Sequence, residues 1–201
     1  MIDFESLLFN IDISSSRVPQ PGAILVAEPF LKEQYFNHSV VCLVDYEPRG
    51  AAMGIVLNQP TAYDLAELIS GINTDRRIPV YCGGPMSCDR LYFIHTLGSY
   101  ISGGRQVAEG LWIGGDFDEM TEYVNSDLPI DGHIRFFVGY SGWSAGQLDG
   151  ELLDNVWAVG LPESPSRLLT GAEDAYWHRC VKALGESYRG WLYHPRNPQS
   201  N

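Results

Sequence analysis

The segment formed by residues 136–157, FFVGYSGWSAGQLDGELLDNVW, constrains the fold more than any other part of the chain. It continues a run rich in β-branched and aromatic side chains, which favours a strand packed on both faces. Gly139 and Gly142 follow, and because glycine permits positive φ and close approach of another backbone segment, we expect a turn there. Leucines then recur at helical spacing, and Asn155 can end such a helix in the left-handed conformation. The segment therefore predicts a strand, a turn, a short amphipathic helix and a second strand.

The rest of the chain consists of short apolar runs separated by turns. The 21 glycines and 12 prolines among 201 residues indicate many turns, and hence short strands rather than a helix bundle. Two runs, at residues 39–46 and 52–57, flank a turn containing proline and glycine and predict an antiparallel hairpin. Thr61 is expected to cap a helix over residues 62–70. Two further helices are predicted over residues 117–125 and 172–184, further strands over 23–27, 78–82 and 90–96, and a further hairpin arm over 106–114.

Charge and composition argue against several functional classes. The formal net charge is −12, with 13 lysine and arginine residues scattered along the chain. Proteins bind phosphate backbones through clustered basic side chains that release counterions, so generic DNA binding is disfavoured. No apolar run approaches the roughly 18 residues of a membrane span, and the N-terminus carries acidic residues where a signal peptide needs basic ones. The four cysteines are too few and too irregularly spaced for a disulfide framework, so we expect a cytoplasmic protein with reduced thiols.

Four motifs, in order along the chain, resemble those of one known family. The stretch GYSGWSAGQLDGELLDNVW looks like the signature of the YqgE/AlgH family of small bacterial proteins. The other three stretches are residues 22–44 (GAILVAEPFLKEQYF and SVVCLV), 52–61 (AMGIVLNQPT) and 83–96 (GGPMSCDRLYFIHT). The resemblance implies an α+β fold in which a mixed, largely antiparallel sheet is bifurcated and rolled into a pseudo-barrel with peripheral helices. The corresponding domain spans residues 22–190, preceded by an N-terminal arm (1–21) and followed by a loose tail (191–201).

The resemblance also implies a kind of function. The family name AlgH comes from an association with transcriptional control, so we expect a binding or regulatory protein rather than an enzyme. The acidic charge indicates that such control would act indirectly, through a small molecule or a protein partner, with no membrane involved. A homodimer, with or without exchange of the arm, is left open. The chain departs from many family members at residues 45–48, where Asp-Tyr-Glu-Pro stands in the region in which those members carry a histidine.

No catalytic, nucleotide-binding or metal-binding motif is complete. Residues 139–143 resemble a nucleophile elbow, but Trp143 occupies the last glycine position of G-x-S-x-G. No lysine follows the Gly-Gly-Pro sequence at residues 83–85 at the spacing of a phosphate-binding loop. The five histidines form no H-x-x-x-H pair, and Cys82 and Cys88 do not have the spacing of a zinc site. We therefore predict no cofactor, no metal and no catalytic residue.

Six polar or amphipathic residues inside the matching motifs are the candidates for a ligand site. They are Asn58, Thr61, His95, Tyr140, Trp143 and Gln147. Tyr140 and Trp143 either wall a pocket for a small ring or a peptide, or plug the open end of the barrel. Two alternatives remain. One is an enzyme acting on a small molecule, with His95, Ser141 or Cys82 in its chemistry; the other is a structural interaction module with an exposed apolar patch.

Overall fold

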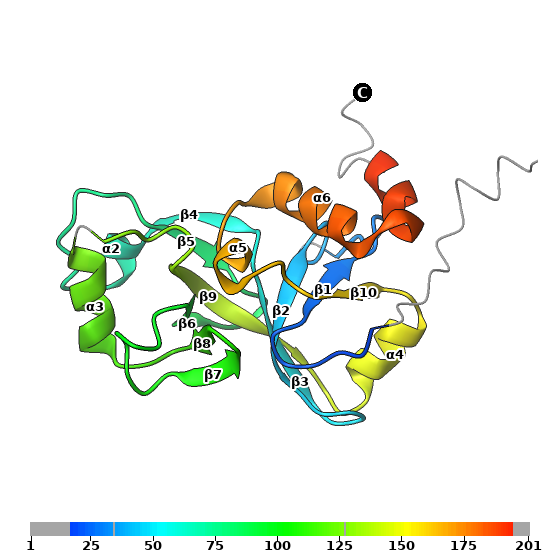
Figure 1. The fold of residues 1–201 in the computed structure, drawn as a ribbon, viewed down its shortest axis with the longest axis horizontal. Coiled ribbons are helices and arrows are strands. Elements are labelled where there is room, and N and C mark those ends of the chain that lie inside the picture. Colours follow the sequence, from blue (N-terminus) through cyan, green and yellow to red (C-terminus); the bar gives the residue numbers. More distant parts are fainter. Residues whose placement is uncertain (1–16, 34, 127, 195–201) are drawn as a thin grey trace, which may run out of the picture.

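The computed structural model describes residues 17–33, 35–126 and 128–194, which form a curled sheet with helices around it (Figure 1). Within these residues the strand order is β10-β1-β2-β3-β9-β6-β8-β7, and β5 lies between β4 and β9. The strands are β1 (Ile24–Ala27), β2 (Val40–Tyr46), β3 (Ala52–Val56), β4 (Pro60–Asp64), β5 (Pro79–Cys82), β6 (Met86–His95), β7 (Arg105–Ala108), β8 (Leu111–Ile113), β9 (Ile134–Trp143) and β10 (Trp157–Gly160). The β5–β9 pair is parallel, and the other described pairs are antiparallel. The expected mixed, largely antiparallel α+β architecture is confirmed.

Helices cover both ends of the curled sheet (Figure 1). They are α2 (Leu65–Leu68), α3 (Phe117–Asn125), α4 (Gln147–Leu153), α5 (Pro165–Leu168), α6 (Glu173–Leu184) and the 3₁₀ helix η1 (Glu186–Tyr193). Helix α6 is tied to the sheet by Trp177, whose indole N–H donates a hydrogen bond of 2.9 Å to the carbonyl oxygen of Ala27. Helices α4 and α6 thus flank one half of the sheet, and α3 packs on the other.

Strand β9 joins the two halves of the sheet (Figure 1). Near its start it lies between β5 and β6, with Phe136 opposite both Val80 and Phe93. Near its end β3 replaces β5 as the neighbour, with Gly142 opposite Met53. The sheet therefore divides along β9, and this strand positions residues in both halves.

The predicted turn at residues 139–142 is wrong, because these residues continue β9 to Trp143. Gly139 does have a positive φ of 74°, but inside the strand. A β-carbon on Gly139 would stand 2.5 Å from the carbonyl oxygen of Gly84 and 2.9 Å from that of Met86. The connection from β5 to β6 passes over β9 at this point, since those strands pair with opposite edges of β9. The glycine makes room for that crossing.

The apolar side chains form three clusters. One lies between the sheet and α6 and contains Tyr176 and Trp177. A second surrounds Leu148 of α4 with Trp143 and Trp157. The third joins α3 to the half of the sheet that contains Phe136. Residues of β9 contribute to all three clusters, which explains why this strand is apolar along both faces.

The helix predicted over residues 62–70 is largely absent. Residues up to Asp64 form β4, and α2 contains four residues only. The N-cap of α2 is Asp64 rather than Thr61, since the Asp64 carboxylate accepts from the amide of Ala66 and forms a capping box with Glu67. Its other oxygen accepts from the amide of Ile78, which ties α2 to β5. The α3 and α6 helices are confirmed, as is the left-handed Asn155 after α4, with φ of 57°.

The described residues include only part of each predicted end segment of the chain. Most of the predicted arm, residues 1–16, lies outside the described residues, as do residues 195–201. Of the predicted tail, Trp191 is buried in the cluster beneath α6 and contacts Tyr188 edge to face. None of the helices in the described part of the chain has the length and apolar character needed to cross a membrane.

Candidate functional site

Three of the six candidate residues line one groove at the C-terminal end of β9. Tyr140, Trp143 and Gln147 line it together with residues of the hairpin formed by β2 and β3, which lies in the lower part of Figure 1. The groove has a volume of about 560 Å³ and is open to solvent. Its lining residues are Asp45, Ala51, Ala52, Met53, Met86, Tyr140, Gly142, Trp143, Ser144 and Gln147. Both aromatic residues therefore line this groove.

The floor of the groove is held by one carboxylate. Trp143 is 5% exposed, and its indole N–H donates a hydrogen bond of 2.7 Å to Oε2 of Glu151. The indole of Trp157 donates to the same oxygen, also at 2.7 Å. Oε1 of Glu151 accepts from the amide nitrogen of Gln147 at 2.9 Å, and Gln147 in turn accepts from the backbone amide of Ser144 at 3.1 Å. Charge-assisted bonds of this kind fix the rotamers of the side chains in the groove floor.

The sides of the groove differ in chemistry. Met53 and Met86 supply flexible thioethers, and Met86 is 44% exposed. The Tyr140 ring is held edge-on against Tyr92, with centroids 5.8 Å apart. Asp45 is the one charged side chain among the ten lining residues. The groove is thus apolar and adaptable, with a single negative charge on its rim.

The turn between β2 and β3 is anchored to α4. The hydroxyl of Tyr46 donates to Oδ1 of Asp149 at 2.9 Å, and the backbone amide of Arg49 donates to Oδ2 at 3.1 Å. Burial, together with the Asp149 carboxylate, raises the pKa of Tyr46 to about 12, so the hydroxyl stays a donor at neutral pH. Asp149 therefore fixes the hairpin at the edge of the groove.

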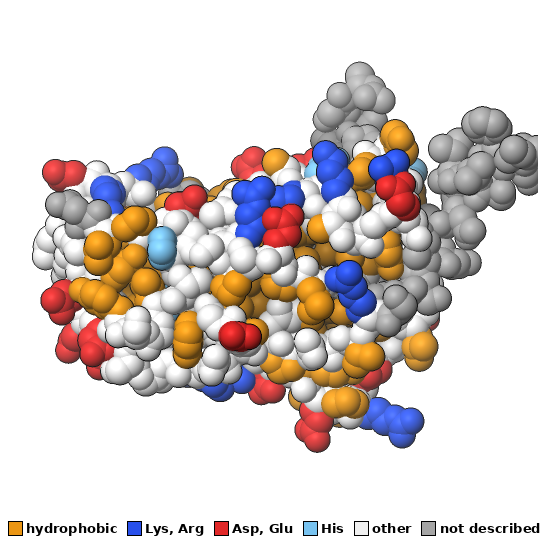
Figure 2. All heavy atoms as spheres, viewed as in Figure 1, with side chains coloured by type: hydrophobic (Ala, Val, Ile, Leu, Met, Phe, Trp, Pro, Cys, Tyr) orange, Lys and Arg blue, Asp and Glu red, His pale blue; other side chains and the backbone are white. Residues whose placement is uncertain are grey.

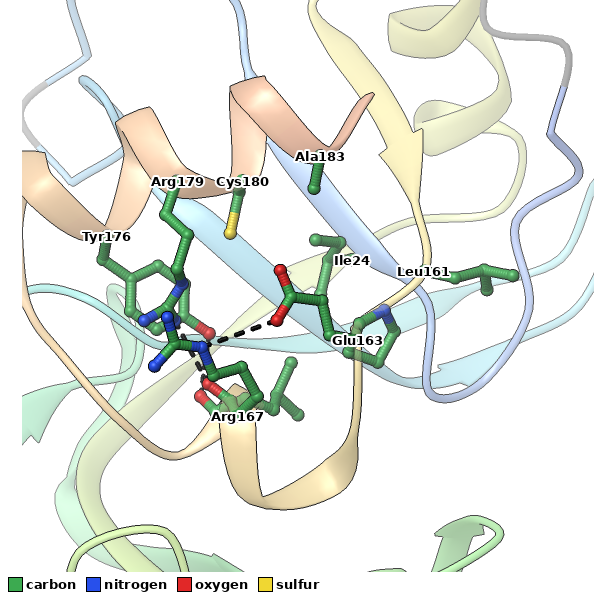
Figure 3. Close-up of a pocket in the computed structure, with 10 residues that line it drawn as sticks. Ile24, Leu161, Glu163, Arg167, Tyr176, Arg179, Cys180 and Ala183 are labelled. Atoms are coloured by element: carbon green, nitrogen blue, oxygen red, sulfur yellow. Dashed lines mark hydrogen bonds and ion pairs between the residues drawn. The ribbon is translucent and has the colours of Figure 1, made fainter. Parts of the chain in front are cut away.

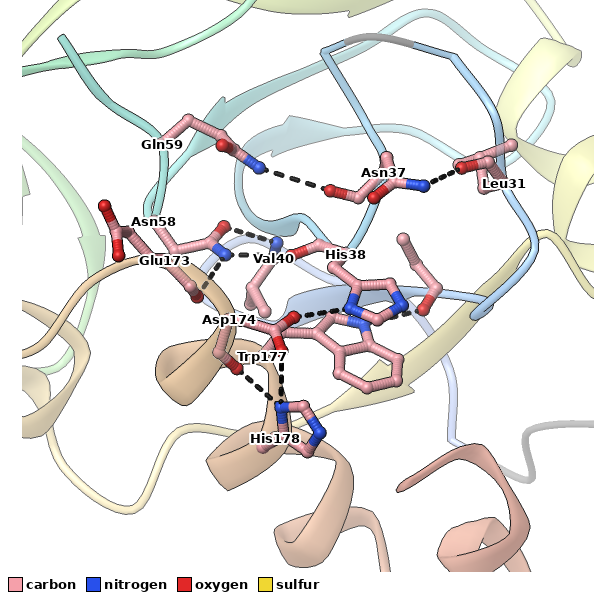
Figure 4. Close-up of polar contacts among 11 residues, drawn as sticks. Leu31, Asn37, His38, Val40, Asn58, Gln59, Glu173, Asp174, Trp177 and His178 are labelled. Carbon is pink, nitrogen blue, oxygen red and sulfur yellow. Dashed lines mark hydrogen bonds and ion pairs between the residues drawn. The ribbon is translucent and has the colours of Figure 1, made fainter. Parts of the chain in front are cut away.

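Asn58, in contrast, is a buried structural residue (Figure 4). Its Oδ1 accepts from the amide of Val40 at 2.9 Å, and its Nδ2 donates at 2.9 Å to the carbonyl oxygens of His38 and Glu173. The backbone of Glu173 also donates to the carbonyl of Asn58, and Glu173 has a positive φ of 54°. Asn58 thus joins β2 to the start of α6, and both polar atoms of its side chain have hydrogen-bond partners.

Figure 4 also shows a cluster that the sequence did not reveal, in which Asp174 lies between two histidines. Nδ1 of His38 lies 2.5 Å from Oδ1 of Asp174, and Nδ1 of His178 lies 3.2 Å from Oδ2. The His38 ring stacks on Trp177 with centroids 3.9 Å apart. His38 and Asp174 are 136 positions apart, so no local pattern could have predicted the pair.

The His38–Asp174 pair is not arranged for catalysis. His38 is 0% exposed, and burial lowers its pKa, with Asp174 opposing that effect. Its Nε2 is buried and makes no hydrogen bond to a described residue. The Pro29 carbonyl raises the pKa of His38, but burial outweighs that effect. A general base must reach a substrate proton. Because Nε2 has no access to solvent, the pair ties the start of β2 to α6.

Thr61 and His95 are also structural. The Thr61 hydroxyl donates to the carbonyl oxygen of Val80 at 2.7 Å, between β4 and β5. His95 is 0% exposed; its Nε2 donates to the carbonyl of Gly114 at 2.9 Å, while Nδ1 accepts from the amide of Leu97 at 3.1 Å. These two contacts assign the Nε2-protonated tautomer. Neither residue lines the groove.

The enzyme alternative required His95, Ser141 and Cys82 to converge. His95 pairs with Ile134 at the start of β9, whereas Ser141 lies near its end, opposite Gly54. Ser141 is 1% exposed, and its hydroxyl donates to the carbonyl oxygen of Gly83 at 3.2 Å. Burial raises the pKa of the Cys82 thiol, which disfavours the nucleophilic thiolate. The three side chains do not form one site.

A small cavity lies between α5 and α6 (Figure 3). Its volume is about 20 Å³, enough for roughly one water molecule. At its edge Arg167 forms an ion pair of 3.5 Å with Glu163, and Arg179 donates to the Arg167 carbonyl at 3.1 Å. On the face in Figure 2, the basic side chains over these helices have acidic ones among them rather than forming a continuous basic stripe. This cavity is too small for an organic ligand, and the mixed charges around it are not the surface expected for duplex DNA.

The chain is similar to known proteins over most of its length. A family model described as AlgH-like matches residues 24–189, which is most of the chain. The chain belongs to the AlgH-like family. A UPF0301 protein of Parabacteroides distasonis is 39% identical over 185 residues, covering 92% of each chain. A UPF0301 protein of Bacteroides thetaiotaomicron is 36% identical over 200 residues, covering 100% of each.

Two solved structures share the fold of this AlgH-like chain. The solution structure of AlgH from Pseudomonas aeruginosa has a TM-score of 0.66 at 27% identity, covering 87% of this chain and 93% of that one. The crystal structure of DIP2367 from Corynebacterium diphtheriae has a TM-score of 0.71 at 21% identity, covering 96% and 100%. Likeness of fold does not by itself give a function. For this AlgH-like protein, function has to be argued from the groove.

Proposed function

We propose that this protein is a non-catalytic binding protein that recognises a peptide segment of a protein partner in the groove at the end of β9. The observation that supports this most is the combination of lining residues. Tyr140, Trp143 and two methionines lie together on an open surface beside one carboxylate. Aromatic residues and methionine are enriched where proteins contact one another. Any regulatory role is then indirect, through that partner.

The shape of the groove favours a peptide over a small ring. Pockets for small molecules bury most of the ligand's surface, whereas this groove is open to solvent. An extended segment can lie along it and pack apolar side chains against Met86 and Tyr140. Because thioethers adapt to different shapes, Met53 and Met86 can follow a partner side chain. The rigid floor at Trp143 supplies a surface on which such a side chain packs.

Charge predicts the chemistry of the partner segment. Asp45 is the charged residue of the groove, and the whole chain carries a net charge of −12. Complementary charge accelerates association and selects partners. We therefore expect a segment with a lysine or arginine next to an apolar or aromatic residue. The basic side chain would face Asp45, and the apolar one would lie against Tyr140.

Peptide selection followed by calorimetry tests this proposal. Random peptides displayed on phage are selected on the pure protein, and the best synthetic peptide is titrated into four proteins, the wild type and three variants. Tyr140→Ala should weaken binding at least about tenfold, and Asp45→Asn should weaken it and reduce its salt dependence. Tyr63→Ala, an exposed tyrosine on β4 away from the groove, is the matched control and should bind like the wild type. Failure to select any peptide, or equal binding by all four proteins, would overturn the proposal.

A further inference from the structure

The first half of β9 carries a second unusual residue, Arg135. This side chain is 5% exposed. Its Nη1 donates to the carbonyl oxygen of Leu57 at 2.9 Å, and its Nη2 donates to that of Leu169 at 2.7 Å. The guanidinium carbon lies 4.3 Å from the centre of the Tyr81 ring, in a cation–π contact. These contacts hold the guanidinium in one place.

The positive charge of Arg135 is not balanced by an opposite charge. Among the described residues no carboxylate forms an ion pair with it, whereas four other pairs of charged or histidine side chains lie within ion-pair distance. Burial lowers the pKa of the guanidinium, while Asp131, which is exposed, acts on it only through space. Burying an unpaired ion is unfavourable, and carbonyl dipoles with a ring offset that cost only in part. A guanidinium has five N–H donors, and the two carbonyls occupy two of them.

A pocket lies beside this guanidinium. It is bounded by β5, the start of β9 and the residue after α5, and its volume is about 150 Å³. Its lining residues are Arg77, Ile78, Pro79, Tyr81, Ile130, Asp131, Ile134, Arg135, Phe136 and Leu169. Most of the lining is apolar, and Arg77 and Asp131 are its exposed charged members. A cavity of about this volume with apolar walls can hold a single benzene-sized ring.

We propose that this pocket binds a small organic carboxylate, with Arg135 as the counter-charge and the apolar side chains enclosing the body of the ligand. A planar carboxylate matches the fork of N–H donors on a guanidinium. The apolar walls and the Asp131 carboxylate disfavour a free phosphate, which is more highly charged and lacks an apolar body. The site shares no lining residue with the Tyr140 groove, so it adds a second binding function to the chain.

Benzoate is a suitable probe, because its ring matches the pocket volume and its carboxylate can meet Arg135. Calorimetric titration of the full-length protein should show saturable binding of benzoate. Benzamide, which has the same shape but no charge, and inorganic phosphate should each bind at least about tenfold more weakly. If benzoate does not bind, or if benzamide or phosphate binds as well as benzoate does, the proposal is overturned.

Two variants locate the binding. Arg135→Lys keeps the charge but loses the fork, and Ile130→Trp places a large ring over the pocket while leaving the buried guanidinium in place. Each should weaken benzoate binding at least about tenfold. Ile130 is only partly buried, so Ile130→Trp is expected to fold even if Arg135→Lys does not. Arg167→Lys, at an exposed arginine on α5, is the control and should bind as the wild type does. Equal affinity in wild type and Ile130→Trp would place benzoate elsewhere and contradict the proposal.

Discussion

The thioether sulfur of Met86 lies 2.7 Å from the point where a β-carbon of Gly142 would stand. The Tyr140 ring comes within 3.3 Å of the same point. Because Gly142 has no side chain, both residues can close over β9 and form one wall of the groove. The shape of the proposed peptide site therefore depends on a missing side chain, which makes it open to a minimal test.

Gly142→Ala should reshape the groove without unfolding the protein. Alanine recovers backbone entropy that glycine loses in a strand, and Met86 can rotate away from the new methyl group, so the free energy of unfolding should change by less than about 1 kcal/mol. In a protein labelled at its methionine methyl groups, the NMR signal of Met86 should shift. Met120, a fully buried residue of α3, is the internal control and should not shift. An unchanged Met86 signal would contradict the close approach.

Gly139→Ala should destabilise the fold strongly. The positive φ of 74° is unfavourable for alanine, and the new methyl group would overlap the carbonyl oxygens of Gly84 and Met86. We expect a loss of at least about 3 kcal/mol in the free energy of unfolding by urea, or no folded protein. Gly146→Ala is the matched control: its φ is 73° but no atom lies within 4 Å, so it should lose only about 1 kcal/mol. Equal losses in the two variants would show that the crossing over β9 is not tight.

Glu151→Gln should loosen the groove floor. The neutral amide oxygen can still accept from both indoles, as Oε2 of Glu151 does, but the amide nitrogen in place of Oε1 cannot accept from the Gln147 side chain. Hydrogen bonds to a charged acceptor are roughly twice as strong as neutral ones, so the urea midpoint should fall and the tryptophan fluorescence of the native state should change. Glu122→Gln, an exposed site on α3, should leave both unchanged. Identical behaviour of the two variants would argue against the carboxylate anchor.

Acid should weaken the fold through His95. Burial lowers the pKa of His95 below its ordinary value of 6.5, so the folded ring stays neutral while the unfolded chain takes up a proton. The stability that depends on neutral His95 is complete above about pH 6.5 and is lost as the pH falls toward the lowered pKa. Urea unfolding between pH 7.5 and 5 should show a shallower decline for His95→Gln than for the wild type. Parallel curves would mean that burial does not lower the pKa of His95.

Much of the fold could be predicted because the local signals agree with the tertiary structure. The hairpin of β2 and β3, the helix after Asp116 and the long α6 all follow from apolar spacing and capping residues. The left-handed Asn155 was also predictable, because asparagine tolerates that conformation. The groove residues Tyr140, Trp143 and Gln147 were found because they lie in one motif that stays together in space.

The features that the sequence predicted wrongly or did not reveal have a common physical cause. Gly139 and Gly142 predicted a turn, but their small size serves a backbone crossing and a methionine side chain, and neither contact is visible in the local sequence. Thr61 precedes a helix-like pattern, yet pairing with β5 makes that segment a strand. The contacts of Asn58, His38 and Arg135 span long separations along the chain, and a single sequence does not show such separations.

Site-specific photo-crosslinking at position 86 tests the central claim, that the groove binds a protein partner, most directly. A photoreactive amino acid replaces Met86 in the protein produced in its own host, and in a second strain it replaces Tyr63. We predict that one protein is crosslinked from position 86 and not from position 63. The crosslink should also be lost when Tyr140→Ala or Asp45→Asn is added, and the same pair should form from purified components. No crosslink at position 86, or the same crosslinks from both positions regardless of the groove variants, would contradict it.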